Sequence, residues 1–201
     1  MLNMTRALSL VLALGCALPF QVAAQEAETT PATEPATSAE SDLSLGTDAS
    51  AVPEPFVKAT HGDWQLRCIR VADGSDPCEL YQLLKDAQGN SVAEITMVAL
   101  PDGNEAIAGA TIIVPLETLL TKELTIAIDG NNPKRYPFTF CASVGCFARI
   151  GLTGAEITAM KKGSKAAVSV VPFAAPDQVV SVDVSLTGFT DAFTAVTAER
   201  P

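Results

Sequence analysis

Apolar and polar side chains alternate along much of the chain after residue 55. In "VVSVDVSLTG" every second residue from Val180 to Leu186 is apolar, and the residues between them are polar. The segments "WQLRC", "SVAEITMVAL" and "ELTIAID" repeat this period of two. Such a period places apolar side chains on one face and predicts half-buried strands of a mostly antiparallel sheet.

Turn signals separate these strands at short spacing. "DAQGNS" and "PDGN" lie between apolar runs and carry the glycine and asparagine residues that tight hairpin turns require. We count seven or eight strands in all. The pattern therefore predicts a mainly β protein, built as an antiparallel β-sandwich.

Two segments have helical spacing instead. In "GLTGAEITAMKKGSK", Thr153 and Glu156 have the spacing of a capping box, and Leu152 and Ile157 that of a hydrophobic staple. In "GFTDAFTAVTAER", one helical face is apolar. We expect two short helices that cover the core of the sandwich. The apolar face of the second helix consists of Phe189, Phe193 and Val196.

Residues 1–24 have the features of a secretory signal peptide. Arg6 precedes an apolar run, and the small residues "VAA" follow it. Pro19 and Gln21 interrupt the run, which is too short for a membrane-spanning helix. We expect export and cleavage after residue 24. Cys16 would be a lipid-acceptor cysteine in a lipoprotein signal, but the residues before it do not fit that pattern, so we expect it to leave with the signal.

Residues 25–55 form an acidic segment rich in alanine, threonine and proline. This segment holds seven acids and no base, and the whole chain has 13 Lys and Arg against 23 Asp and Glu. Such a composition predicts a disordered linker. The acidic balance also argues against nucleic acid as a partner, because nucleic-acid binding requires a basic face. Residues 56–201 remain as one domain of ordinary size.

Four cysteines follow the signal: Cys68, Cys78, Cys141 and Cys146. In an oxidising compartment, close pairs of cysteines favour disulfides, and the short loops between them favour Cys68–Cys78 and Cys141–Cys146. A four-cysteine zinc site and a redox pair are the alternatives. Neither pair has the Cys-x-x-Cys spacing of a redox motif, and exported thiols tend to oxidise.

Candidate catalytic groups are scarce. His61 is the only histidine, and no Gly-x-Ser-x-Gly motif accompanies it. We therefore interpret His61 as a surface residue before a strand, and we expect no cofactor, no metal and no enzymatic activity. The basic segment "NNPKRYPF", with Lys134, Arg135 and Tyr136, is interpreted as a solvated hairpin tip, with contact to an acidic partner as the alternative.

Three groups of motifs resemble the invasion-associated locus B family of bacterial envelope proteins. They are "HGDWQLRC…DPCELYQ", "FTFCASVGCFARIGLTGAEITAMKKGSKAAV" and "VSLTGFTDAF", in the order found in that family. The resemblance covers about residues 57–196. His61 departs from it, because the family often has Phe there. The motif residues that we expect to be structural are Gly62, Asp63, Trp64, Gly145, Gly188 and Phe189.

The resemblance implies an immunoglobulin-like β-sandwich in the periplasm or at the outer membrane. It also implies a link to host-cell invasion, and it carries no catalytic residues over to this chain. We expect a non-enzymatic interaction module whose partner is an unknown protein or a ligand of the envelope or host surface. The alternatives are a structural envelope protein without a dedicated partner, and a hydrolase or redox enzyme using His61 or the Cys141/Cys146 pair.

Overall fold

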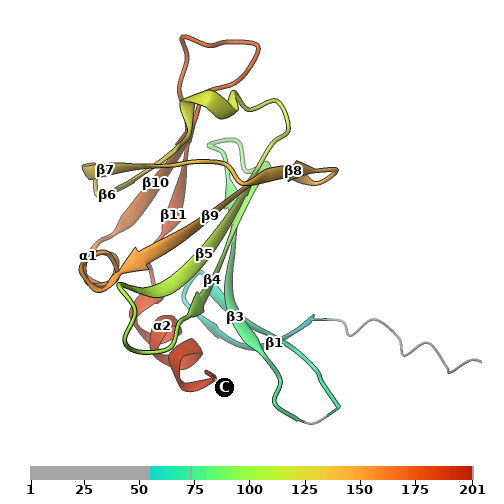
Figure 1. Ribbon diagram of the computed structural model, residues 1–201, viewed down its shortest axis with the longest axis vertical. Coiled ribbons are helices and arrows are strands. Elements are labelled where there is room, and N and C mark those ends of the chain that lie inside the picture. Colours follow the sequence, from blue (N-terminus) through green and yellow to red (C-terminus); the bar gives the residue numbers. More distant parts are fainter. Residues whose placement is uncertain (1–54, 73, 201) are drawn as a thin grey trace, which may run out of the picture. The chain divides into compact units, whose positions relative to one another are not determined.

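The computed structural model describes residues 55–72 and 74–200, which form a mainly β domain of two antiparallel sheets with two α-helices (Figure 1). The larger sheet has seven strands in the order β1-β2-β3-β4-β5-β9-β8. Its strands are β1 (Pro55–His61), β2 (Trp64–Ile69), β3 (Cys78–Lys85), β4 (Ser91–Ala99), β5 (Ala106–Val114), β9 (Gly145–Thr153) and β8 (Phe140–Ala142).

The smaller sheet has four strands in the order β11-β10-β6-β7. Its strands are β11 (Val180–Ser185), β10 (Lys165–Val170), β6 (Leu124–Ile128) and β7 (Asn131–Tyr136). A 3₁₀ turn, Leu120–Lys122, precedes β6. The two sheets make an open sandwich, which confirms the predicted fold class.

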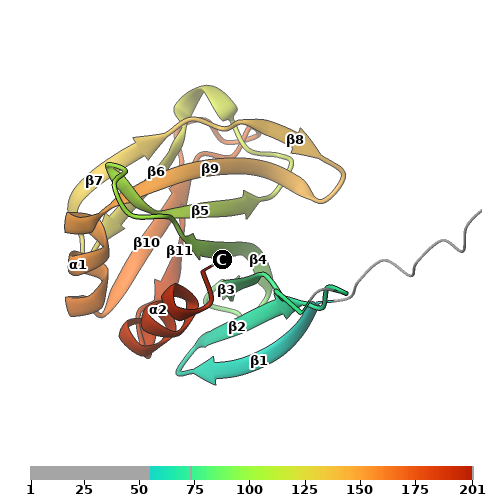
Figure 2. The same ribbon diagram turned by 60° about the horizontal axis from the view of Figure 1, so that its bottom comes forward.

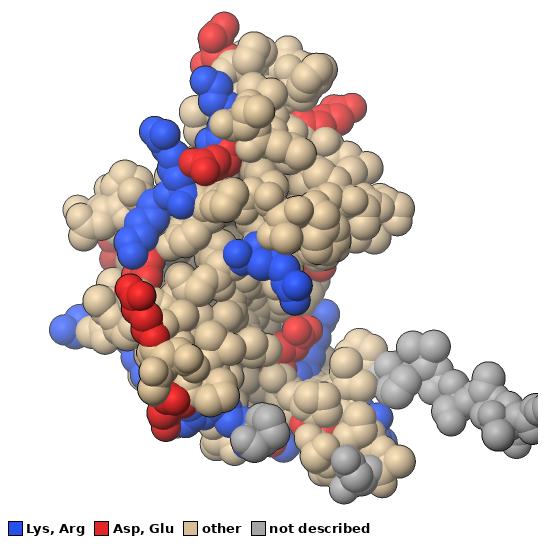
Figure 3. All heavy atoms as spheres, viewed as in Figure 1, with Lys and Arg blue, Asp and Glu red and all other residues tan. Residues whose placement is uncertain are grey.

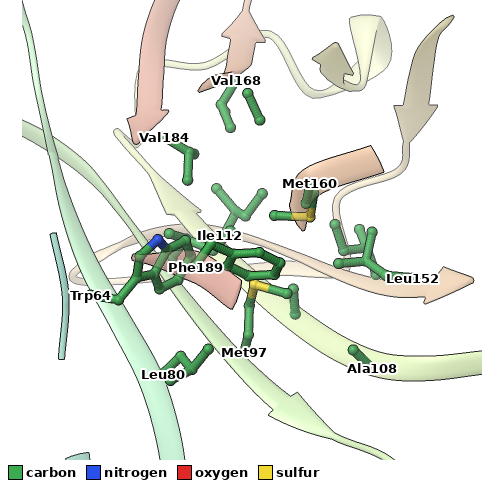
Figure 4. Close-up of a cluster of buried hydrophobic side chains, with 14 of the residues drawn as sticks. Trp64, Leu80, Met97, Ala108, Ile112, Leu152, Met160, Val168, Val184 and Phe189 are labelled. Carbon is green, nitrogen blue, oxygen red and sulfur yellow. The ribbon is translucent and has the colours of Figure 1, made fainter. Parts of the chain in front are cut away.

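The period of two in the sequence corresponds to the buried face of each strand. Trp64, Leu66 and Cys68 are all buried on β2, and Ile95 and Met97 are buried on β4. Apolar side chains from both sheets and both helices form one core (Figure 4). Burial of this apolar area is the main contribution to stability.

Helix α1 (Gly154–Lys162) begins as its sequence predicts. Thr153 is the N-cap, and its hydroxyl accepts a hydrogen bond from the backbone N–H of Glu156, whose carboxylate accepts one from the backbone N–H of Thr153 in return. Leu152 and Ile157, the two staple positions, are both buried. The predicted capping box is therefore confirmed, and it fixes the angle at which α1 leaves β9.

Helix α2 (Phe189–Ala198) packs against β2, β3 and β4 (Figure 2). Its buried side chains lie on one face, as predicted. They are Phe189, Ala192, Phe193 and Val196.

Eleven strands are present between residues 55 and 200, more than the seven or eight predicted. Strands β1, β7 and β8 lack the alternating apolar pattern: β1 contains a bulge, β7 is largely exposed, and β8 has three residues. These three edge strands bury few side chains, so their sequences show little period of two, whereas the edge strand β11 has a buried face and shows it clearly. The segment "NNPKRYPF" is exposed, as predicted, but it is not the tip of a hairpin, because Asn131–Tyr136 is the second strand of the β6–β7 hairpin and the edge strand of its sheet.

The predicted signal peptide and all but the last residue of the predicted linker lie outside the described residues. Strand β1 begins at Pro55, one residue before the expected domain boundary. No helix within the described part of the chain is long and apolar enough to cross a bilayer.

Candidate functional site

The glycines of two distant motifs lie against each other. Gly62 is in the turn between β1 and β2, and Gly188 precedes α2; both have positive φ, 59° and 79°. A Cβ atom on Gly62 would overlap the carbonyl oxygen of Thr187, and one on Gly188 would overlap that of His61. The backbone N–H of Asp63 donates to the Thr187 carbonyl at 3.2 Å. Only glycine permits this approach at both positions.

Polar contacts around Ser185 complete this junction. The Ser185 hydroxyl donates to Asp63 Oδ2 at 2.6 Å, and the indole N–H of Trp64 donates to the Ser185 carbonyl at 2.9 Å. The Gln82 side chain donates to that carbonyl at 3.0 Å and accepts from the Ser185 N–H at 2.7 Å. The Trp64 and Phe189 rings pack with centroids 5.3 Å apart (Figure 4). These motif residues thus join the first hairpin to the end of β11 and the start of α2.

Sequence reasoning did not identify Gln82 or Ser185. The one available signal was Gln82 itself, a polar residue on the same face of β3 as the apolar residues Leu80 and Leu84. A buried amide needs hydrogen-bond partners, which the backbone of Ser185 supplies.

His61 is the last residue of β1, and its Nε2 is buried without a hydrogen-bond partner among the described residues. His61 is thus partly exposed and precedes β2, as predicted, but it belongs to a strand itself and its ring is partly buried. The nearby Ser185 hydroxyl donates to Asp63. A serine hydrolase needs its nucleophile to donate to the histidine, so this geometry does not support the hydrolase alternative.

Both cysteine pairs are disulfides. Cys68 on β2 is bonded to Cys78 on β3, with an S–S distance of 2.03 Å. Cys141 on β8 is bonded to Cys146 on β9, at 2.09 Å. Gly145 has φ 147°, and a Cβ atom there would overlap the carbonyl oxygen of Val114 on β5. Within the described residues, no group of His, Cys, Asp and Glu side chains has metal-binding geometry.

A cleft of about 680 Å³ opens between the two sheets beside α1. One wall comes from β9 and α1, and the other from β6, β7 and β10. Its inner surface is apolar and its mouth is polar, which is the usual character of a ligand site of this size. Apolar residues of the inner surface include Ile126, Ile128, Ile150, Leu152, Met160 and Val168.

The carboxylate of Glu156 on α1 interacts with three side chains at the mouth of the cleft. Lys134 Nζ lies 2.9 Å from Glu156 Oε1, and the Tyr136 hydroxyl donates to the same oxygen at 2.8 Å. The backbone N–H and the hydroxyl of Thr153 donate to Oε2 at 2.9 and 2.7 Å. Both carboxylate oxygens are thus fully engaged.

These contacts shift two pKa values in opposite directions. Burial alone would raise the pKa of Glu156, but the hydrogen bonds from Lys134, Thr153 and Tyr136 outweigh it and lower that pKa to about 2. The pKa of Tyr136 is raised, first by burial and then by its hydrogen bond to the Glu156 carboxylate. Glu156 is therefore held as the anion, and Tyr136 as the neutral phenol.

A second, smaller hollow of about 460 Å³ lies on the outer face of the larger sheet. Its charged lining residues are Glu79 and Arg149. The Arg67 guanidinium stacks 3.2 Å from the centroid of the Tyr81 ring, and the Tyr81 hydroxyl donates to Glu94. Burial raises the pKa of Glu79, against the effect of Arg67. The cleft between the sheets has the larger volume and the more apolar surface, so we take it as the candidate site.

Comparison with known proteins identifies the family. The family model for invasion associated locus B (IalB) protein matches residues 64–197. The chain belongs to the invasion-associated locus B family. The crystal structure of invasion associated protein B from Bartonella henselae resembles this IalB-family protein with a TM-score of 0.60 and 21% identity, over 70% of this chain and 94% of that chain. No curated protein matches the chain.

The family match begins within the first motif, since Gly62 and Asp63 precede its first residue, and it includes the motif at the other end of the domain. Residues 64–197 begin at Trp64 and extend into α2, so the junction around Ser185 lies at the two limits of the matched region. The family residues singled out from the sequence are thus brought together by the fold, except Gly145, which lies at the start of β9. Of the residues that line the cleft, only Lys134 and Tyr136 were considered for binding, in the alternative interpretation of "NNPKRYPF".

Proposed function

We propose that this IalB-family protein is an exported protein of the bacterial envelope that acts by binding, and that the cleft between its sheets is the binding site. The role is association with a host cell, as the family name suggests. Peripheral attachment to the outer membrane is compatible with this role.

The observation that carries the proposal is the open, apolar cleft. A sandwich that served only as a scaffold would gain dispersion and hydrophobic energy by closing its two sheets on each other. Here Ile126 and Ile128 on β6 remain partly exposed although they face a core. An apolar surface left open in this way is typical of an interaction site.

The charged groups of the cleft support binding rather than catalysis. A general acid or base needs a pKa near the working pH and a free proton site. Glu156 is held well below that range, and the Tyr136 proton is already donated to it. The sulfur atoms that a redox mechanism would use are joined in disulfides.

A matched pair of substitutions on α1 tests the proposal. Ala159 is exposed and lines the cleft, so Ala159→Trp fills the cleft without disturbing the core. Thr158 is its exposed neighbour outside the cleft, and Thr158→Trp is the control. Each variant replaces the chromosomal copy, and attachment to and entry into host cells are counted.

We expect Ala159→Trp to reproduce the deletion phenotype and Thr158→Trp to behave as wild type. Secretion and folding of both variants are checked by their protein level and by circular dichroism. If the strain with Ala159→Trp attaches to and enters host cells as the wild type does, the cleft is not the binding site. A deletion strain that behaves as wild type in host association, but has a weakened envelope, would favour the structural alternative.

A further inference from the structure

We infer that the cleft binds a single-chain amphiphile, with a hydrocarbon tail on the apolar inner surface and an anionic head group at the mouth. This inference rests on the proposal that the cleft is the binding site. It adds the chemical class of the ligand, which neither the family nor the related structure indicates.

The inner surface of the cleft fits a hydrocarbon chain. Ile126 and Ile128 of the smaller sheet face the same space as Ile150 and Leu152 of the larger one. Polar groups of a ligand placed between these side chains would lose their hydrogen bonds to water without replacement. Met160 also lines this space, and its flexible thioether side chain can adapt to an irregular apolar ligand.

A peptide is a poorer occupant than a hydrocarbon. A bound strand would need free backbone groups along the cleft, and β6 and β10 already use theirs within the smaller sheet. The smaller sheet has a free edge at the cleft along β7, and in the larger sheet the part of β9 after Phe147 pairs with β5 alone. Strand β7 contains Pro133, which has no N–H, and the charged residues Lys134 and Arg135. Proline and basic side chains are the features that prevent strand addition at an edge.

The mouth has an uncommitted positive charge. Lys162, in the last turn of α1, lines the cleft and has no ion-pair partner among the described residues. The two acids that line the cleft have other partners: Glu156 is paired with Lys134, and the Asp129 carboxylate accepts hydrogen bonds from the backbone N–H groups of Ser164 and Lys165.

Two further basic side chains lie on α1 and β7 but do not line the cleft. Lys161 lies over the Phe193 ring at 5.0 Å, and Arg135 is exposed on β7. Figure 3 shows Lys and Arg side chains gathered on the side of the molecule where β7 lies. Of the four charged residues that line the cleft, the side chain of Lys162 alone has neither an ion pair nor a hydrogen bond among the described residues, so it is free to pair with an anionic head group.

Calorimetric titration of the folded protein with amphiphiles below their micelle concentrations tests the inference. The probes are octanoate, decanoate and dodecanoate for tail length, and dodecyl maltoside and dodecyltrimethylammonium for the head group. We expect affinity to rise about fourfold for each added CH₂ group. Dodecanoate should bind more tightly than either of the other dodecyl probes.

Four variants locate the site. Ala159→Trp should abolish dodecanoate binding, and Thr158→Trp should leave it unchanged. Lys162→Gln should weaken binding about two- to fivefold, as expected for one exposed charge pair, with a smaller effect at high salt. Lys122→Gln, at an exposed lysine outside the cleft, is its control and should have no effect.

The outcomes separate the two proposals. Equal affinity for the three dodecyl probes, with binding still lost in Ala159→Trp, would refute the anionic head group and keep the cleft as the site. No saturable binding of any probe would refute the amphiphile inference. The proposed function would then stand only if Ala159→Trp still failed in host association, and would fall if that variant behaved as wild type in both assays.

Discussion

At the residue scale, the fold depends on two glycines, each of which packs against the backbone of the chain segment that contains the other. Gly62 and Gly188 are far apart in sequence, and each occupies a place where a Cβ atom would meet backbone of the other segment. The family resemblance pointed to both residues as structural. The resemblance could not indicate that the two glycines are in contact, because neither motif contains a feature that identifies the other as its neighbour in space.

Gly188→Ala tests this contact, and Gly89→Ala is the matched control. Both glycines have positive φ, 79° and 85°, but Gly89 has open space where the Cβ atom would lie. Gly89→Ala should lower the free energy of unfolding by about 1–2 kcal/mol, the cost of the left-handed conformation alone. Gly188→Ala should lower it by about 3 kcal/mol more, because backbone must move.

Urea unfolding followed by circular dichroism measures both values. Equal losses for the two variants would show that the close approach of the two segments contributes nothing to stability. The same result would remove the structural role assigned to this pair of family motifs.

At the element scale, the sequence predicted the elements that bury a regular face. The capping box at Thr153 predicted α1, and the apolar stripe predicted α2. The strands with strict alternation lie where the sequence predicted them. Strand β7 was missed because Asn131–Tyr136 is an exposed edge with a proline in it. Strand β7 pairs with β6 and buries almost none of its side chains, so its sequence carries little of the signal, unlike that of the edge strand β11.

Glu156 at the start of α1 should make stability depend on pH in the acid range. Its pKa in the folded state, about 2, is below the ordinary value of 4.5 in the unfolded chain. The stabilisation is therefore complete above about pH 4.5 and is lost as the pH falls toward 2, and it amounts to at most about 3 kcal/mol.

Glu156→Gln should remove this part of the pH dependence, since glutamine keeps the capping box but cannot ionise. The measurement is the free energy of unfolding of both proteins between pH 6 and pH 2. Their difference should be largest near pH 6 and should shrink toward pH 2. Glu105→Gln, exposed in the turn between β4 and β5 and outside the cleft, should follow the wild-type curve at all pH values.

At the scale of the whole molecule, the candidate site arises from the divergence of the two sheets. Its lining residues run from Ile95 on β4 to Val184 on β11 and come from both sheets and α1. Along the sequence these residues are ordinary apolar positions of strands, identical in pattern to those that close the core around Trp64. The sequence therefore predicted a sandwich but not the opening in it, which depends on how far the sheets separate.

The disulfides fit this interpretation of a preformed site. Cys68–Cys78 joins β2 to β3, and Cys141–Cys146 joins β8 to β9. Both lie in the larger sheet, which carries one wall of the cleft on β9. A wall fixed before the ligand arrives reduces the conformational entropy that binding must overcome.

The most direct test of the account is methyl NMR of the isotope-labelled protein during titration with dodecanoate. The account predicts saturable shifts of the Ile126, Ile128 and Leu152 methyl groups, which line the cleft, and none at the exposed Ile69 on β2. Shifts confined to the outer face of the larger sheet, at Leu83 and Val98, or no saturable shift at any cleft methyl group, would contradict it.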